Sequence, residues 1–307
     1  FYRHLLTEPL SYAFSLLFVS FVFKLIFNFN YKNLIWCSIL ILSLLLIRNQ
    51  FMFLYIVILM LYLGLLVINK SKKNFTLLTI SFLSILIIHN ALIGLNKHMS
   101  QSSMEKNNLL NSSTGIFFFT YIDSIYISTE KDIKIFKNQK VQESLSIIFE
   151  EMNKKKSLVK YYNGRGHFGL SFKEISSYSK TILEDLAISE NTNVVNLKKQ
   201  ISMKLIKANF GKYLKHIFKK FYDSSWLFIF FPFFMMLAAL IGFIKYKSQF
   251  SLFVLFLSTF ALANHSIVYL FGRVQPRYFI YSDFILLIFI FITFTILLKK
   301  QNGKIFK

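Results

Sequence analysis

The sequence has few of the residues on which disulfide-stabilised, metal-dependent and nucleotide-binding proteins rely. Cys37 is the single cysteine among 307 residues, so no disulfide can form within the chain and a folded loop must be held by packing alone. His4, His89 and His98 lack the spacing of metal ligands, and no nucleotide-binding loop or nucleophile motif occurs. The sequence therefore predicts no metal site and no cofactor, and it leaves metal dependence open.

Apolar residues are abundant instead. Hydrophobic residues make up 55% of the chain and the mean hydropathy is +0.51, too high for a soluble globular domain. They occur in blocks that approach or exceed the roughly 18 residues of a membrane span. We expect an all-α polytopic membrane protein with about seven transmembrane helices, at residues 9–29, 34–47, 51–68, 75–94, 225–244, 249–271 and 279–298. The second block ends at Arg48-Asn49-Gln50, so 34–68 is either two steeply inclined short spans or a re-entrant hairpin.

Lysines in the short connectors predict the orientation of these spans, because Lys and Arg in short loops are retained in the cytoplasm. Lysine clusters follow the third, fifth and last spans, all on one side of an alternate threading. The predicted cytoplasmic segments are 30–33, 69–74, 245–248 and 299–307. The predicted outer segments are 1–8, 48–50, 95–224 and 272–278. Residues 1–94 and 225–307 thus form the membrane part, with a cytoplasmic tail.

Residues 95–224 are long enough for a folded extracytoplasmic domain. We expect an α+β fold, with one or two strands over Gly115 to Ile127 and helices over 141–153 and 173–189. The stretch 197–221 alternates apolar residues with lysines at helical spacing, which predicts an amphipathic helix on the membrane surface. The alternative is a helix that covers the core of the loop domain.

The loop domain is basic, with 20 Lys and Arg165 against 12 acidic residues. Such a surface suits anionic headgroups or polyanionic glycans, and it is equally typical of the solvated faces of a lysine-rich protein. We do not expect nucleic acid as a partner, because the domain is predicted outside the cytoplasm and has no nucleic-acid-binding module.

Arginine is rare, which makes its positions informative. Lys and Arg together number 36, and only five are Arg: Arg3, Arg48, Arg165, Arg273 and Arg277. All five lie on the predicted outer face. Because the guanidinium binds phosphate through a planar pair of donors, membrane-edge arginines indicate a phosphate held at headgroup level. The alternative is that some arginines cap helix ends or pair with acids.

Outside the loop domain the only acidic residues are Glu8 and Asp283, both near the predicted outer surface. Ionisable groups at such depths are costly and often functional. Glu8 can instead favour a helix N-terminus, and Asp283 can pair with Arg277. His265 lies in the outer half of its span, where it forms part of a polar pocket or is simply hydrogen-bonded.

Three short motifs resemble the GT-C superfamily of membrane glycosyltransferases, in the branch of protein O-mannosyltransferase-like and aminoarabinose-transferase-like enzymes. They are Leu6-Thr7-Glu8-Pro9-Leu10 before a span, Leu44-Leu45-Leu46-Ile47-Arg48-Asn49-Gln50 between two short spans, and Arg273-Val274-Gln275-Pro276-Arg277-Tyr278 before the last span. Asn49 stands where the family usually has proline. The resemblance covers roughly 1–94 and 225–298.

The resemblance implies transfer of a sugar from a polyprenyl-phosphate carrier to a glycan, lipid or protein acceptor outside a bacterial inner (plasma) membrane. Arg48, Arg273 and Arg277 are the implied phosphate ligands, with Tyr278 beside them. The acidic base of the family lies in its first outer loop, which we expect upstream of Phe1, so the catalytic residue is unknown here and this fragment is expected to be inactive alone. Glu8 does not take that role.

Two other functions remain open from the residues. An O-antigen polymerase or ligase also has many spans and a large outer loop, and Arg165 in Asn163-Gly164-Arg165-Gly166-His167 would be its loop arginine. A transporter or non-catalytic membrane scaffold is the other alternative. A flippase would be expected to have broken or charged helices at the midplane, whereas the polar residues here gather at one surface.

Overall fold

The computed structural model describes residues 2–104, 116–156 and 170–271, and beyond these only Asp283, Phe284, Leu287, Ile288 and Phe291. These residues form two compact units. The membrane unit runs as far as His98 and resumes over Leu227–Ile267, together with the described residues from Asp283 onwards. The loop unit includes Met99–Trp226.

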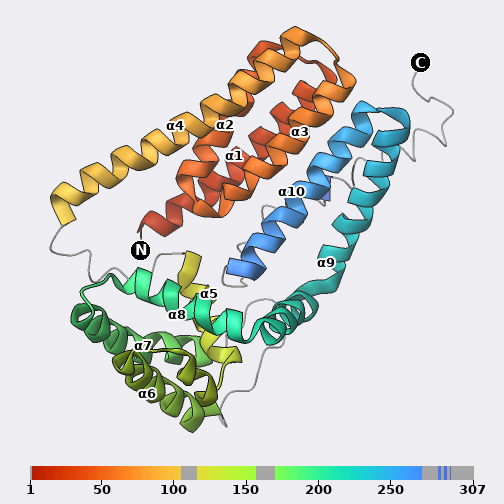
Figure 1. Cartoon of the computed structure of the whole chain (residues 1–307). Coiled ribbons are helices and arrows are strands. Elements are labelled where there is room, and N and C mark those ends of the chain that lie inside the picture. Colours follow the sequence, from red (N-terminus) through yellow and green to blue (C-terminus); the bar gives the residue numbers. More distant parts are fainter. Residues whose placement is uncertain are drawn as a thin grey trace. The chain divides into compact units, whose positions relative to one another are not determined.

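The membrane unit is a bundle of long apolar helices (Figure 1). Its helices are α1 (Tyr2–Phe27), α2 (Tyr31–Ile47), α3 (Leu54–Ile68), α4 (Lys72–Met104) up to His98, α9 (Phe210–Tyr246) from Leu227, and α10 (Gln249–Phe271) up to Ile267. Phenylalanine rings join the helices in its core. Phe18 of α1 meets Phe256 of α10 edge to face, with ring centroids 5.7 Å apart. Such pairs stabilise packing beyond the burial of their area alone.

The break predicted within 34–68 is present, as two helices separated by a short turn. The side chain of Asn30 caps the start of α2 by accepting a hydrogen bond from the Asn33 N–H at 2.8 Å. The helix ends at Arg48, whose backbone is extended, with φ −149° and ψ 129°. A 3₁₀ helix, η1 (Asn49–Phe53), then leads directly into α3. Phe51 and Phe53 are buried and Met52 is 41% exposed, so the two phenylalanine rings anchor η1 in the unit.

The prediction of seven spans is wrong for the part of the chain that the structure describes. Four helices there are long and apolar enough to cross a bilayer: Pro9–Phe27, Phe51–Ile68, Lys72–Leu95 and Gln249–Val268. Two further apolar helical segments, Tyr31–Ile47 and Phe230–Tyr246, are shorter than these four. Most of the predicted span 279–298 and the tail 299–307 lie outside the described residues.

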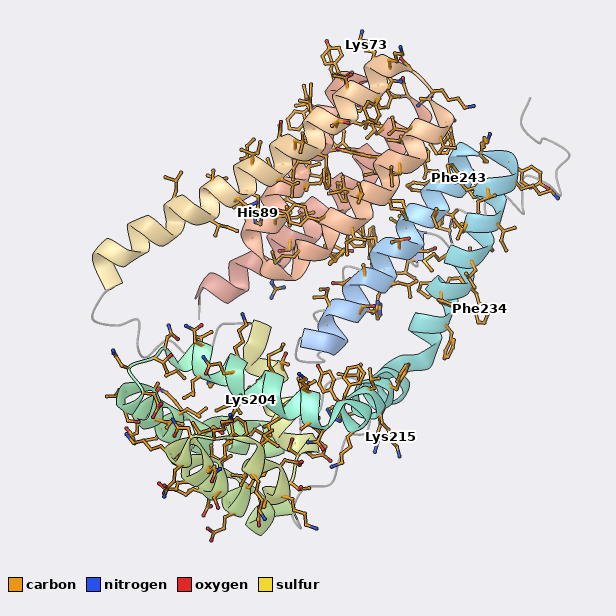
Figure 2. All side chains as sticks on the ribbon, in the orientation of Figure 1. Lys73, His89, Lys204, Lys215, Phe234 and Phe243 are labelled. Atoms are coloured by element: carbon orange, nitrogen blue, oxygen red, sulfur yellow. The ribbon has the colours of Figure 1, made fainter. Side chains whose placement is uncertain are left out.

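The membrane unit has a lysine end and an arginine end. The connectors at 28–30, 69–71 and 247–248 lie together at the lysine end, and α2 and α3 turn at Arg48 at the opposite end (Figure 1). Figure 2 shows Lys73 at the lysine end of α4 and His89 farther along the same helix. The described helices of this unit thus alternate in direction, with the lysine-bearing connectors at one end.

The loop unit is also helical, and the predicted α+β fold is wrong, since no strand occurs among its described residues. Its core lies among α5 (Ile116–Ile127), α6 (Gln139–Lys156), α7 (Leu170–Ser189) and α8 (Val194–Ala208), with a short 3₁₀ helix, η2 (Glu130–Ile135). The β-branched and aromatic run at 115–127, predicted as strands, is helical because Tyr121, Ile122 and Ile125 fall on one helix face and are buried in this core. Tertiary packing here overrides local β-propensity. The two predicted helices correspond to α6 and α7.

The amphipathic helix predicted over 197–221 is interrupted at Asn209, so the prediction of one continuous helix is wrong. Asn209 is 7% exposed, and its backbone, with φ −119° and ψ 34°, leaves the α-helical region. The first part, α8, buries Leu197, Ile201 and Leu205 in the loop unit. This is the alternative given above, a helix that covers the core.

The second part, the start of α9, exposes an apolar stripe. Phe210, Leu214 and Phe218 are 57%, 40% and 70% exposed and lie four residues apart on one helix face. Tyr213 and Ile217, on the adjacent face, are buried. This stripe keeps the pattern of a membrane-surface helix over a shorter length than predicted.

Candidate functional site

Arg48 is the one predicted phosphate ligand whose position the structure describes. It lies between α2 and η1 at the arginine end and is half-buried. Its backbone N–H donates to the Leu44 carbonyl at 3.2 Å, which closes the last turn of α2. The buried rings of Phe51 and Phe53 hold the following turn. Arg48 is therefore carried by a fixed break between two helices.

A buried histidine and an acid form the second element of the site. His265 of α10 is 1% exposed, and its Nδ1 is 2.8 Å from the Ala261 carbonyl, to which it donates. Its Nε2 lies 3.9 Å from Oδ1 of Asp283. The T-shaped contact between Tyr12 and Phe284, at 5.4 Å, brings the segment of Asp283 against α1. An imidazole bonded in this way is oriented by its carbonyl partner and can exchange a proton only through Nε2.

One aromatic contact places these two elements at the same end of the membrane unit. Phe53 of η1 packs edge to face on Phe260 of α10, with centroids 5.1 Å apart. Phe53 follows Arg48 by five residues, and His265 follows Phe260 by five. At 1.5 Å per residue, five residues of helix span about 8 Å, so His265 lies within about two turns of the level of η1.

The other predicted site residues are not tested. Arg165, Arg273, Arg277 and Tyr278 lie outside the described residues. Glu8 falls within α1, but its side chain is not described. The convergence of three arginines on one cavity, and the pairing of Asp283 with Arg277, remain predictions. The structure adds His265 as a partner of Asp283, although the sequence suggested only a polar neighbourhood for it.

Sequence reasoning missed a set of polar contacts between the apolar helices. The Tyr55 hydroxyl of α3 is hydrogen-bonded to Nδ1 of His89 on α4, and His89 is 3% exposed. The Ser81 hydroxyl of α4 bonds both to Tyr62 of α3 and to Ser38 of α2, each at 2.8 Å. Such bonds hold helices together where lipid gives no hydrophobic drive. Their mixed spacing along three helices leaves no local sequence signal.

The loop unit contains a second histidine–acid pair. Nε2 of His216, on α9, lies 3.3 Å from Oδ1 of Asp123, on α5, and both side chains are almost fully buried. The ring of Tyr126 packs on that of His216 at 5.3 Å. Burial and the negative charge of Asp123 raise the pKa of Tyr213 to about 12. This pair joins α5 to the start of α9 and so supports the position of the apolar stripe.

Among the described residues, no three His, Cys, Asp or Glu side chains are grouped so that they could hold a metal ion.

No model of a known protein family matches this chain, and no curated protein and no solved structure matches it either. A function must therefore be argued from the residues and their geometry.

Proposed function

We propose that this chain is part of a membrane glycosyltransferase that takes a sugar from a polyprenyl-phosphate carrier and passes it to an acceptor at the arginine end. The observation that carries the proposal is the pair of buried His265 with half-buried Asp283, at the same end as Arg48. Ionisable groups inside an apolar helix bundle are costly and are retained where they act on a substrate or an ion. The motif resemblance to the GT-C superfamily supports the same function.

The chemistry requires positive charge at this end. During transfer the bond between the sugar's anomeric carbon and the carrier phosphate breaks, and a bond to an acceptor oxygen forms. The phosphate leaves with the bonding electrons, and a base takes the acceptor's proton. Arg48 would stabilise the charge that develops on the phosphate, an effect larger near an apolar boundary than in water. The His265–Asp283 pair would hold a proton beside it.

The orientation belongs to the same proposal. The lysine end would face the cytoplasm of a bacterial inner (plasma) membrane, and the loop unit would lie outside. Cys37 is 1% exposed, so it gives little background in labelling with a membrane-impermeant maleimide. In sealed cells, a cysteine at exposed Lys199 should react and one at exposed Lys72 should not. The reverse pattern would refute the orientation.

The phosphate role is tested by substitution of Arg48 in the full-length enzyme. Arg48→Ala should weaken binding of a polyprenyl-phosphate analogue by about tenfold or more, the effect of losing one charge-assisted contact. Arg48→Lys should fall between the wild type and Arg48→Ala, because it keeps the charge but loses the paired donors. Lys70→Ala, which removes an exposed cation at the other end, is the matched control and should bind normally.

Unchanged binding by Arg48→Ala would refute the phosphate role. Asp283→Asn gives an independent readout, because it removes the negative charge beside His265 and keeps the size of the side chain. The rate of transfer by this variant should fall while its thermal unfolding stays as in the wild type. An unchanged rate would show that the pair only holds α10 in place.

A further inference from the structure

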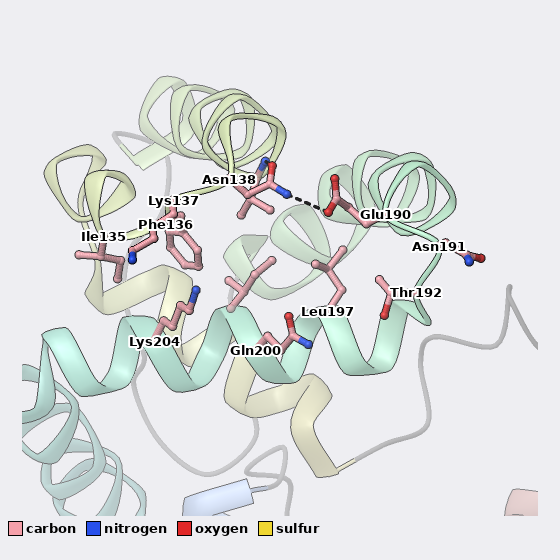
Figure 3. Close-up of a pocket in the computed structure, with 12 residues that line it drawn as sticks. Ile135, Phe136, Lys137, Asn138, Glu190, Asn191, Thr192, Leu197, Gln200 and Lys204 are labelled. Atoms are coloured by element: carbon pink, nitrogen blue, oxygen red, sulfur yellow. Dashed lines mark hydrogen bonds between the residues drawn. The ribbon is translucent and has the colours of Figure 1, made fainter.

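A hollow of about 620 Å³ lies on the loop unit, between η2, the turn from α7 to α8, and α8 itself (Figure 3). This volume is within the range of about 300–1,000 Å³ typical of small-molecule sites. All of its lining residues belong to the loop unit, so the hollow does not depend on the position of the membrane unit. None of its residues takes part in the site proposed above.

One wall is held by the side chain of Asn138. Its Oδ1 accepts from the Lys140 and Val141 N–H groups at 2.9 and 3.3 Å, which caps the start of α6. Its Nδ2 donates to Oε2 of Glu190 at 2.8 Å, as the dashed line in Figure 3 shows. One N–H of the amide thus fixes the carboxylate of Glu190 at the hollow.

The turn that carries Glu190 contains a residue in the left-handed conformation. Asn191 has φ 46°, a conformation that asparagine tolerates better than most residues and that commonly ends helices. Thr192 then donates its N–H to the Ala187 carbonyl at 2.9 Å, which closes the end of α7. This turn brings Glu190 and Thr192 to the hollow, next to Gln200 of α8.

These polar side chains keep hydrogen-bonding groups that the fold does not use. Within the described ranges, the Thr192 hydroxyl and the Gln200 amide make no hydrogen bond to protein, and Glu190 is bonded only through Oε2. At the other end of the hollow, the Lys204 ammonium lies over the ring of Phe136, 5.3 Å from its centroid. The hollow therefore offers an acceptor, an amide and a hydroxyl at one end and a positioned positive charge at the other.

The floor between these ends is apolar. Phe136, Leu197 and Ile201 are 4%, 4% and 1% exposed and belong to the core of the loop unit. Phe136 is also covered by Lys204, so no open ring is present on which a nucleobase could stack. A ligand that fits must be rich in hydroxyls, have a modest apolar face, and carry a negative charge. A sugar with an acidic group has all three properties.

We propose that this hollow binds an anionic sugar unit, with its hydroxyls bonded to Glu190, Thr192 and Gln200 and its acidic group paired with Lys204. The binding itself is independent of the proposed transferase activity. Its role as a site for the acceptor glycan rests on that proposed function.

The test uses the purified full-length protein in detergent and saturation-transfer NMR. The probes are a glucuronic-acid disaccharide, glucose 6-phosphate, and a neutral disaccharide of the same size. The wild type should bind one or both acidic probes and bind the neutral one about tenfold more weakly. Preference between the two acidic probes decides whether the group recognised is a carboxylate or a phosphate.

Three variants on exposed positions of α8 separate the contributions. Lys204→Gln should remove the preference for acidic probes, and Gln200→Leu should weaken binding of all three. Lys207→Gln removes a charge on the same helix away from the hollow and should bind as the wild type does. Equal thermal unfolding of the three variants would confirm that the fold is retained.

No saturation transfer to any probe, or binding unaffected by Lys204→Gln and Gln200→Leu, would refute the inference. Equal binding of citrate would also refute it, because charge alone would then be recognised. The transferase proposal is judged separately. If a variant no longer binds the probes but transfers sugar normally, only the acceptor role of the hollow is overturned. If Arg48→Ala loses transfer but still binds the probes, the inference about the hollow stands.

Discussion

Gly64 allows a close approach between two membrane helices, and its substitution gives a quantitative test of the bundle. It lies on α3 and is buried against Leu252 of α10. A Cβ at Gly64 would lie 3.2 Å from Cδ2 and 3.3 Å from Cγ of Leu252, and closer still to Cδ1. Leu252 is 0% exposed, so it has little room to move away. Small residues commonly permit such contacts between membrane helices.

The expected effect is the difference between two terms. Replacing glycine by alanine in a helix interior stabilises it by about 1 kcal/mol. Overpacking a close-packed core costs about 1–3 kcal/mol. Gly64→Ala should therefore lower the free energy of unfolding by up to about 2 kcal/mol. At Gly94 on α4 an added Cβ would meet no atom within 4 Å, so Gly94→Ala is the matched control and should be neutral or stabilising.

The measurement is reversible unfolding in mixed micelles, with Gly64→Ala, Gly94→Ala, Leu252→Ala and the double variant Gly64→Ala/Leu252→Ala. If the contact is as close as described, the double variant should be less destabilised than the two single changes would give by addition, because shortening Leu252 relieves the overlap. Equal stability of Gly64→Ala and Gly94→Ala would refute the close contact, because it would show that the added methyl group at Gly64 causes no overpacking.

Three further results are expected from the loop unit and α9. Burial raises the pKa of Asp132, but hydrogen bonds led by that from the Thr129 N–H lower it more, so the folded-state pKa is below the ordinary value. The stability that Asp132 adds above about pH 4 should therefore be lost as the pH falls below that value. Asp132→Asn should cost about 0.5–2 kcal/mol at pH 7 in chemical unfolding and reduce this loss of stability at acid pH. Burial lowers the pKa of Lys198 to about 8 despite the negative charge of Glu184, so the folded state binds this proton less tightly than the unfolded state does. Stability measured by thermal unfolding should therefore rise between pH 8 and 10. Lys198→Met should abolish that rise. A fluorophore on Phe218→Cys, in the apolar stripe, should be quenched by brominated lipids in reconstituted protein more than one on Lys215→Cys, and equal quenching would contradict a membrane-facing stripe.

The sequence alone was sufficient to predict the membrane class and the break between two short helices at Arg48. Long apolar blocks have few other uses, because a bilayer requires uninterrupted helices to satisfy the backbone. The alternate threading was likewise readable, since lysines in short connectors mark one side whatever the packing. The same reasoning singled out His265 and Asp283 as unusual residues at one end.

Other features were decided by tertiary contacts. The run at 115–127 has strand-like residues, yet it is a helix because Tyr121 and Ile125 complete a core shared with α8. The break at Asn209 also has a distant neighbour, since the side chain of Asn209 helps to lower the pKa of Asp132 on η2. Local propensity differs by only about 1 kcal/mol between such choices, so a few buried contacts reverse it.

The candidate sites show the same division. Residue type and membrane position were enough to suggest Arg48, Asp283 and His265 as members of one polar end. The pairing of His265 with Asp283, and the hollow beside Glu190, could be found only once helices distant in sequence were brought together. The physical reason is that hydropathy and charge sorting act along the chain against water and lipid, whereas a pair or a pocket exists only through contacts between residues that the sequence leaves far apart.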